Sequence, residues 1–216
     1  MSSVAPLSWQ VAGRAQPDPG SHGGVRALIG ESAWAGLPAA VRARFAEHAE
    51  AIEYHGSFEV VRASRLGWLF AQLGRLIGTP VVPWVGENMP AIVHVLPNDR
   101  GVTWLREYQR AGGARCVVRS TKVIAGNAMT ERLPARLCMP LHVYAAQDTL
   151  HFVSRGYYFD LGWLHVALPS WLSPGVTHVE HIDEGDGWFR FTMTVRHPLF
   201  GEVYFQTGRF RAAGEA

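Results

Sequence analysis

Hydrophobic and polar residues alternate along much of the second half of the chain, most regularly over residues 101–120. An extended strand points successive side chains to opposite faces, so Trp104, Arg106 and Tyr108 share one face. A second extended run follows the Gly112-Gly113 pair, and glycine supplies the positive φ angles that tight hairpin loops require. The pattern predicts a β-hairpin with an arginine on its aromatic face.

Arg106 is the most informative residue of this hairpin, because an aromatic-rich face of a single sheet is the buried one. An unpaired buried ion costs several kcal/mol even after relaxation, so an inward Arg106 needs a carboxylate partner. Ser120 and Glu131 fall on the next two strands and can converge on it, and Glu131 is the partner that we expect. Such a cluster has two interpretations: a clamp for a carboxylate or polar head group, or a structural buried ion pair.

Strand-like runs separated by short turn sequences continue from Met89 to the C-terminus. A sheet of about ten sequential twisted strands tends to curl or close, which also removes its exposed edges. The predicted fold class is therefore α+β and mainly β: a curved antiparallel meander that closes toward a lipocalin-like barrel, with two N-terminal helices. The expected strands are Ala91–Leu96, Val102–Tyr108, Arg115–Ile124, Ala128–Leu133, Cys138–Ala145, Thr149–Phe159, Gly162–Ala167, Val176–Asp183, Trp188–Arg196 and Glu202–Arg211.

Two helices are predicted before the meander. Apolar residues at helical spacing after Pro38 predict an amphipathic helix of about three turns. A strand-like run, Ala51–Arg62, separates it from a second helix that Ser64 caps and that Gly78 helps to end. Because this second helix is apolar on more than one side, we expect a sheet to cover it or the helix to plug a barrel mouth. Its leucines repeat at helical spacing: Leu66, Leu69, Leu73 and Leu76.

Composition indicates one globular domain. The 216 residues are 48% hydrophobic and 18% charged, and a chain of this length can bury roughly 70% of its unfolded surface. Residues 1–24 are rich in proline and glycine and predict a flexible tail, which leaves residues 25–216 as a single β-rich domain. No apolar run long enough for an integral membrane segment is uninterrupted; the nearest, Leu66–Gly86, contains Arg75 and two prolines.

The content of charged residues, cysteine and histidine indicates which binding partners and which cellular location to expect. The net charge of +2 and the lack of a dense Lys/Arg run argue against nucleic-acid binding. Two cysteines are too few for a disulfide scaffold and lie at no metal-ligand spacing, so we expect a reducing, cytoplasmic location. The ten histidines include no His-x-His or His-x-x-x-His pair, and we predict neither a metal nor a cofactor. His142 or His165 would act as a general base if it faced a cavity beside Arg106.

Several short motifs occur in an order that resembles a known family. They are WLREY at 104–108, Ser120 followed by Glu131, GWLHVALPSWLSP at 162–174 and HPLFGEVYFQTGRF at 197–210. Together they resemble an uncharacterised bacterial domain family that is often found C-terminal to saccharopine-dehydrogenase-like Rossmann proteins. The resemblance spans roughly Leu28 to Arg211 and implies a compact β-rich domain that accompanies a dinucleotide-binding oxidoreductase. This chain has no Gly-x-Gly-x-x-Gly motif, so the domain either finds such a partner in trans or acts without one.

Aromatic residues spread over consecutive strands support a ligand cavity, because small-molecule pockets combine apolar walls with a few convergent polar groups. The alternative is that these bulky residues simply fill the barrel. The loop Ala167–Gly175 contains two prolines, which cannot donate ladder hydrogen bonds, and we expect it to form a rim or lid. The candidate ligand-binding residues are Trp104, Arg106, Tyr108, Ser120, Glu131, His142, Trp163, Trp171 and Tyr204.

Three functions are compatible with these patterns. The first is an accessory or ligand-binding domain that holds a small amphiphilic or hydrophobic molecule in a β-lined cavity and partners an oxidoreductase. The second is an isomerase- or cyclase-type enzyme that acts on an apolar substrate with Arg106 and a cavity histidine or Glu131. The third is a pure interaction module for a Rossmann-fold oxidoreductase.

Overall fold

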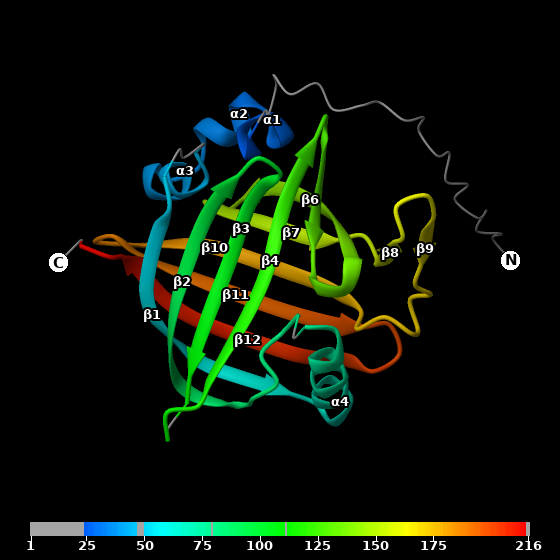
Figure 1. Cartoon of the computed structure of the whole chain (residues 1–216). Coiled ribbons are helices and arrows are strands. Elements are labelled where there is room, and N and C mark those ends of the chain that lie inside the picture. Colours follow the sequence, from blue (N-terminus) through cyan, green and yellow to red (C-terminus); the bar gives the residue numbers. More distant parts are fainter. Residues whose placement is uncertain (1–23, 47–49, 79, 111, 215–216) are drawn as a thin grey trace, which may run out of the picture.

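The structure is a computed structural model and describes residues 24–46, 50–78, 80–110 and 112–214. Ten antiparallel strands form a closed barrel (Figure 1), because β5 pairs with β6 at one seam and β1 pairs with β12 at another. Around the ring these strands are β1 (Ile52–Ala63), β2 (Gly86–Asn98), β3 (Gly101–Gln109), β4 (Arg115–Ala125), β5 (Ala128–Arg132), β6 (Leu137–Ala146), β7 (Thr149–Ser154), β10 (Val176–Gly185), β11 (Trp188–His197) and β12 (Gly201–Ala212). The predicted mainly β, barrel-forming fold class is confirmed.

Between β7 and β10 the chain leaves the ring and forms further strands. Two short strands, β8 (Tyr158–Asp160) and β9 (His165–Ala167), form a hairpin that extends from the start of β6. The strands predicted for Thr149–Phe159 and Gly162–Ala167 are therefore too long. The first run is divided between β7 and β8, and the second contains only the short strand β9. Gly156, with a φ of +119°, ends the first run, since only glycine adopts that angle readily, and the chain then pairs with a different strand.

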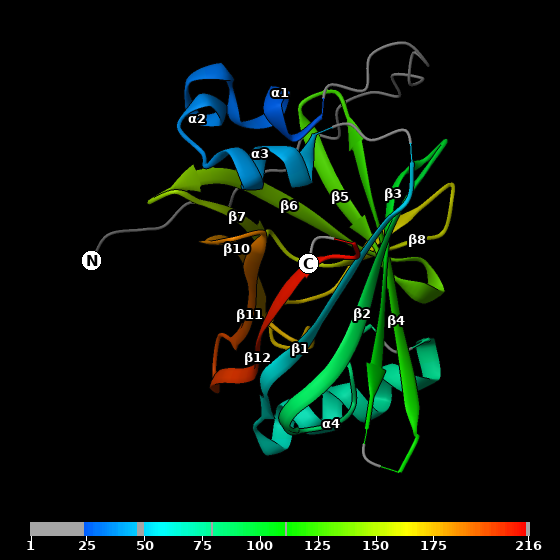
Figure 2. The same cartoon turned by 90° about the vertical axis from the view of Figure 1, so that its left-hand side faces the viewer.

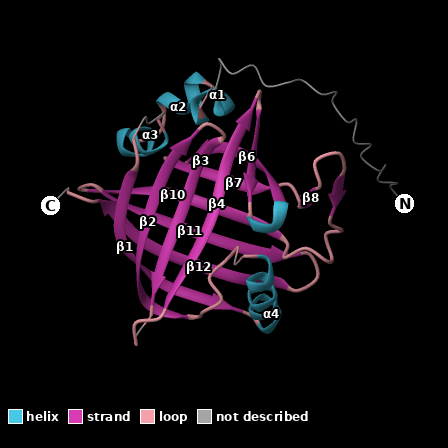
Figure 3. Cartoon of the chain, in the orientation of Figure 1, coloured by secondary structure: helices cyan, strands magenta, loops and turns pink. Residues whose placement is uncertain are grey.

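Helices cover both ends of the barrel (Figures 2 and 3). Three short ones, α1 (Val25–Ile29), α2 (Glu31–Ala35) and α3 (Ala39–Phe45), lie at one end. The fourth, α4 (Arg65–Gly74), lies at the other end and continues into the 3-10 helix η1 (Arg75–Ile77). A second 3-10 turn, η2 (Pro134–Arg136), joins β5 to β6.

The helix predicted after Pro38 is shorter than expected. Pro38 is its N-cap and so lies just before the first turn, where the sequence had suggested it would lie. The helix α3 ends at Phe45 because Ala46 is extended, with φ −62° and ψ 161°. Two further helices, α1 and α2, precede it, and Gly30 separates them with a φ of +84°. Apart from Gly24, the tail predicted for residues 1–24 lies outside the described residues.

Helix α4 begins and ends as predicted but packs through an unexpected face. The Ser64 hydroxyl accepts a hydrogen bond from the Gly67 amide at 3.1 Å, and Gly78 closes η1 in the left-handed region. The packed face consists of small residues, Gly67, Ala71 and Gly74. A Cβ on Gly67 would lie 1.8 Å from the Val203 carbonyl oxygen, so the helix approaches β12 backbone to backbone. This close approach turns most of the predicted leucine stripe outward: Leu69, Leu73 and Leu76 are exposed, whereas Leu66 packs against the core.

The period-two alternation of the sequence is kept inside the barrel. Trp104 and Tyr108 are buried in one core cluster, and the Tyr108 ring stacks on Phe58 at 4.8 Å between centroids. A second cluster fills the space between α1–α3 and strands β5–β7. Within the described part of the chain, no helix has the length and apolar character needed to cross a membrane.

Candidate functional site

Polar side chains from three consecutive strands meet on the inner wall of the barrel. Strand β3 supplies Arg106, β4 supplies Ser120 and Lys122, and β5 supplies Glu131. In the antiparallel ladders Ser120 is paired with Trp104, and Lys122 is paired directly with Glu131. Because residues 120 and 122 are two apart on one strand, both point to the same face. We call Arg106, Ser120, Lys122 and Glu131 the interior polar cluster.

Contacts within the interior polar cluster link all four residues. Lys122 Nζ lies 3.4 Å from Glu131 Oε1, and the two side chains are only 10% and 8% exposed. Arg106 Nη1 donates to Ser120 Oγ at 3.4 Å, and Ser120 also hydrogen-bonds Glu131. The guanidinium of Arg106 lies 5.8 Å from the centre of the Phe191 ring.

The predicted contact between Arg106 and Glu131 needs a correction. Arg106 points inward, as expected, but the ion pair of Glu131 is made by Lys122. The register explains this exchange, since Lys122 lies directly opposite Glu131 whereas Arg106 lies one strand further away and opposite Val118. Arg106 acts on Glu131 through its charge. Strand periodicity from Ser120 would have identified Lys122.

The electrostatics of the pair are governed by burial and by the surplus of cations. Burial alone would raise the pKa of Glu131, but the charges of Lys122 and Arg106 and the hydrogen bond from Ser120 outweigh it, so the pKa is lowered and the carboxylate stays ionised. Burial lowers the pKa of Lys122, with the nearby Arg106 charge adding to this effect and Glu131 opposing it. The cluster therefore holds two basic side chains against one carboxylate.

Two cavities adjoin the interior polar cluster, one on each side of Lys122. The α3-side cavity has a volume of about 250 Å³, and its walls include Phe45, Trp104, Lys122 and Met129. The α4-side cavity has a volume of about 100 Å³, and Arg106, Lys122 and Glu131 face it. Its remaining wall is mostly apolar and comes from α4, β6, β10, β11 and β12. Lys122 is thus the side chain that the two cavities share.

The tyrosines of the interior have hydrogen-bond partners of their own. The hydroxyls of Tyr108 and Tyr204 both donate to Gln206 Oε1, each at 3.2 Å. Tyr157 and Thr177 share a hydrogen bond of 2.7 Å. Burial raises the pKa of Tyr108 to about 12, so this phenol stays neutral. Tyr204 borders the α4-side cavity, whereas Tyr108 lies behind it in the core.

His181 is an interior residue that the sequence analysis did not select. It is 2% exposed and packs against the rings of Phe45 and Trp104, with centroids 4.8 and 5.7 Å away. Burial lowers its pKa well below the ordinary value, and the charges of Arg44, Lys122 and Arg106 add to this effect. The imidazole is therefore neutral. The alternation of β10 places His181 on the inner face together with Val179, and that pattern could have identified it.

Three predicted site residues lie outside the barrel. For His142 and Trp163 this corrects their assignment to the cavity, whereas Trp171 belongs to the segment that was expected to form a rim or lid. His142 follows Leu141 on β6 and points outward by alternation. Trp163 lies in the β8–β9 loop and is 85% exposed, and Trp171 is 64% exposed. His165, the other candidate base, is on β9 and exposed. The segment 168–175, which contains Trp171, is turn and bend without strand, as its prolines predicted.

The remaining predicted residues are inside: Trp104, Arg106, Tyr108, Ser120, Glu131 and Tyr204 all point into the barrel. The arrangement offers cationic donors beside a carboxylate and next to apolar walls. Chemically, such a surface can bind an anionic or polar head group together with a short apolar chain.

A family model described as "Domain of unknown function (DUF4166)" matches residues 37–210. The match covers the whole barrel up to Phe210 together with α3 and α4. Neither a curated protein nor a solved structure matches the chain.

Proposed function

We propose that this chain, which belongs to the DUF4166 family, binds a small amphiphile with an anionic head group inside its barrel. The single observation that carries the proposal is the charge imbalance at the α4-side cavity. Among the described residues that line this cavity, Arg106 and Lys122 face one carboxylate, Glu131. A buried surplus of positive charge is unfavourable by itself, and an anionic ligand would neutralise it.

Arg106 is the group best placed to hold the head group. A guanidinium has five N–H donors in a fixed fork and binds carboxylates and phosphates in a bidentate manner. Within the described chain, its one side-chain hydrogen bond goes to Ser120, and no carboxylate lies within 4.0 Å of it. Its other donors are therefore available to a ligand at the cavity wall.

Lys122 would control how much space the ligand has. Each cavity is smaller than the roughly 300 Å³ of typical small-molecule pockets. A shift of the Lys122 side chain would join the two cavities into one volume above that limit. In this proposal the head group lies between Arg106 and Lys122, and the apolar chain extends toward Trp104 and Phe45 in the α3-side cavity.

The experiment that tests this proposal is mass spectrometry of ligands retained by the purified protein. Wild-type protein is predicted to release a copurified anionic amphiphile on denaturation, and Arg106→Leu is predicted to release much less. Arg119→Leu is the matched control, because Arg119 is exposed on the neighbouring strand. Equal yields from Arg106→Leu and wild type would contradict the assignment of Arg106.

The isomerase or cyclase alternative has lost part of its support. Of the bases predicted for it, His142 and His165 lie outside the barrel, and only Glu131 is at a cavity. An oxidoreductase partner in trans stays a prediction from the family resemblance. A pull-down with the tag-free protein coupled directly to a resin tests this prediction. Stoichiometric recovery of a Rossmann-fold protein would support it.

A further inference from the structure

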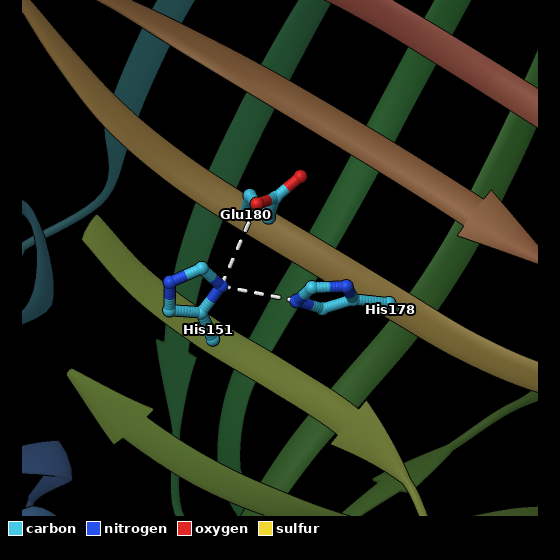
Figure 4. A group of neighbouring side chains, drawn as sticks. All are labelled: His151, His178 and Glu180. Carbon is cyan, nitrogen blue, oxygen red and sulfur yellow. Dashed lines mark hydrogen bonds and ion pairs between the residues drawn. The ribbon is translucent and has the colours of Figure 1, made fainter. Parts of the chain in front are cut away.

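Strands β7 and β10 carry a second polar group on the outer face of the barrel. Phe152 and Val179 point into the core from these strands, so alternation directs His151, His178 and Glu180 outward. His151 is paired directly with Glu180, and His178 lies two residues before Glu180 on the same strand. Antiparallel pairing therefore brings the three side chains to one place (Figure 4).

The three ligand atoms lie at distances that suit one metal ion. His151 Nδ1 is 3.0 Å from His178 Nε2 and 3.6 Å from a carboxylate oxygen of Glu180. One ligand atom from each residue lies within 4.8 Å of the others. Tetrahedral ligands that are each about 2.0 Å from zinc lie roughly 3.3 Å apart, so small side-chain adjustments suffice.

The orientation of His151 is already fixed by its neighbours. Its Nε2 donates to the Ala146 carbonyl oxygen at 3.3 Å, which leaves the lone pair on Nδ1 directed at the other two groups. The Tyr144 ring stacks on the imidazole, with centroids 4.7 Å apart and planes 12° apart. A metal-binding histidine typically donates its second ring N–H to a backbone carbonyl in this way.

The charge of the cluster also suits metal binding. Glu180 places a carboxylate beside the two imidazoles. This carboxylate would balance part of the charge of a bound cation.

We propose that His151 Nδ1, His178 Nε2 and a carboxylate oxygen of Glu180 bind one Zn²⁺ ion. Two imidazole nitrogens and one carboxylate oxygen favour a borderline transition ion over Mg²⁺ or Ca²⁺, which prefer oxygen ligands. Three protein ligands leave the fourth position of a tetrahedral ion to water. Spacing in the sequence gives no sign of this site, because its ligands come from two strands that meet only in the fold.

The ion would cross-link two strands of the barrel, β7 and β10, that share a short ladder. The ladder between β7 and β10 has four residue pairs, and the segment 155–175 leaves the ring between these strands. A metal bound across this seam would hold β7 to β10 at the point where the chain departs. The site is on the outer face, so its test is independent of the ligand proposed for the interior.

Calorimetric titration of tag-free, chelator-treated full-length protein with ZnCl₂ tests the site. The wild-type chain is predicted to bind one Zn²⁺ per chain, and His178→Ala and Glu180→Gln are each predicted to weaken binding at least tenfold. His142→Ala is the matched control, since His142 is an exposed outer-face histidine that stacks on Tyr144. It is predicted to bind Zn²⁺ like wild type.

A second readout separates loss of the site from loss of the fold. Zn²⁺ is predicted to raise the melting temperature of wild type and of His142→Ala, but not of Glu180→Gln, whose ligand atom is partly exposed and whose change is small. Absence of one-to-one binding to wild type overturns the proposal. Undiminished binding to both His178→Ala and Glu180→Gln also overturns it, because the ion would then be held elsewhere.

Discussion

Lys122 and Glu131 face each other directly across strands β4 and β5, with Nζ 3.4 Å from Oε1 in the interior of the barrel. The register of β4 and β5 sets this cross-strand contact. Lys122 lines both cavities, and Glu131 lines the α4-side cavity. Removing one partner of a buried pair leaves an uncompensated charge, whereas replacing both by apolar residues is often tolerated.

Replacing one residue of this pair is therefore predicted to destabilise the protein more than replacing both residues. Lys122→Met alone should lower the free energy of unfolding by about 3–5 kcal/mol. The double variant Lys122→Met, Glu131→Leu should recover much of that loss, because the carboxylate that loses its Lys122 partner in the single variant is then absent as well. Urea unfolding of the single and double variants measures the difference. Additive losses would mean that the two residues do not act as a pair.

The interior histidine predicts a specific dependence of stability on pH. The folded-state pKa of His181 is depressed, so below the ordinary pKa of about 6.5 the unfolded state binds a proton that the folded state does not. Its effect on stability is absent above about pH 6.5, and destabilisation grows as the pH falls toward the folded pKa. His181→Leu should lose less stability than wild type between neutral and mildly acidic pH. Parallel curves for the two proteins would contradict this.

Glu131 affects the stability of the fold in a lower pH range than His181 does. Its pKa is lowered from the ordinary 4.5 in the folded state, so its ionised form contributes stability above about pH 4.5 that is lost as the pH falls through the folded value. Glu131→Gln should therefore show a shallower loss of folding free energy on acidification than wild type. Acid titration followed by circular dichroism measures both slopes.

The packing of α4 gives a test by substitution. Gly67→Ala would place a Cβ 1.8 Å from the Val203 carbonyl oxygen, and we expect it to cost at least about 2 kcal/mol or to displace the helix. Leu73→Ala changes an exposed side chain and should alter stability by less than about 0.5 kcal/mol. Thermal unfolding of the two variants compares them. The reverse order would mean that the leucine face is the packed one.

Periodicity predicted the barrel strands well, because Trp104, Arg106 and Tyr108 share the inner face of β3 as the alternation indicated. It failed for α4, where the leucine stripe suggested a packed face. A small-residue contact with β12 is decided by backbone proximity, which hydrophobic spacing does not encode. Capping by Ser64 and the stop at Gly78 were local signals and were correct.

The site was predicted only in part, for a reason of register. Alternation indicated that Arg106 faces inward, and the order of the strands and the family resemblance indicated Glu131 as its partner. Which cation lies opposite Glu131 depends on the pairing of β4 with β5. That pairing made Lys122 the partner. The position of the aromatic Trp163 could not be inferred from its type, because exposed and buried tryptophans look alike in a sequence. Likewise, His151 and His178 meet only through a pairing of strands distant in the chain.

The most direct test of the central claim compares binding of decanoate and decanol by titration calorimetry with wild type and Arg106→Leu. We predict that wild type binds decanoate at least tenfold more tightly than decanol, because Arg106 and Lys122 recognise the anionic head group. Arg106→Leu should lose most of that preference, whereas Arg119→Leu should keep it. Equal affinity of wild type for the acid and the alcohol, or an unchanged preference in Arg106→Leu, would contradict the account.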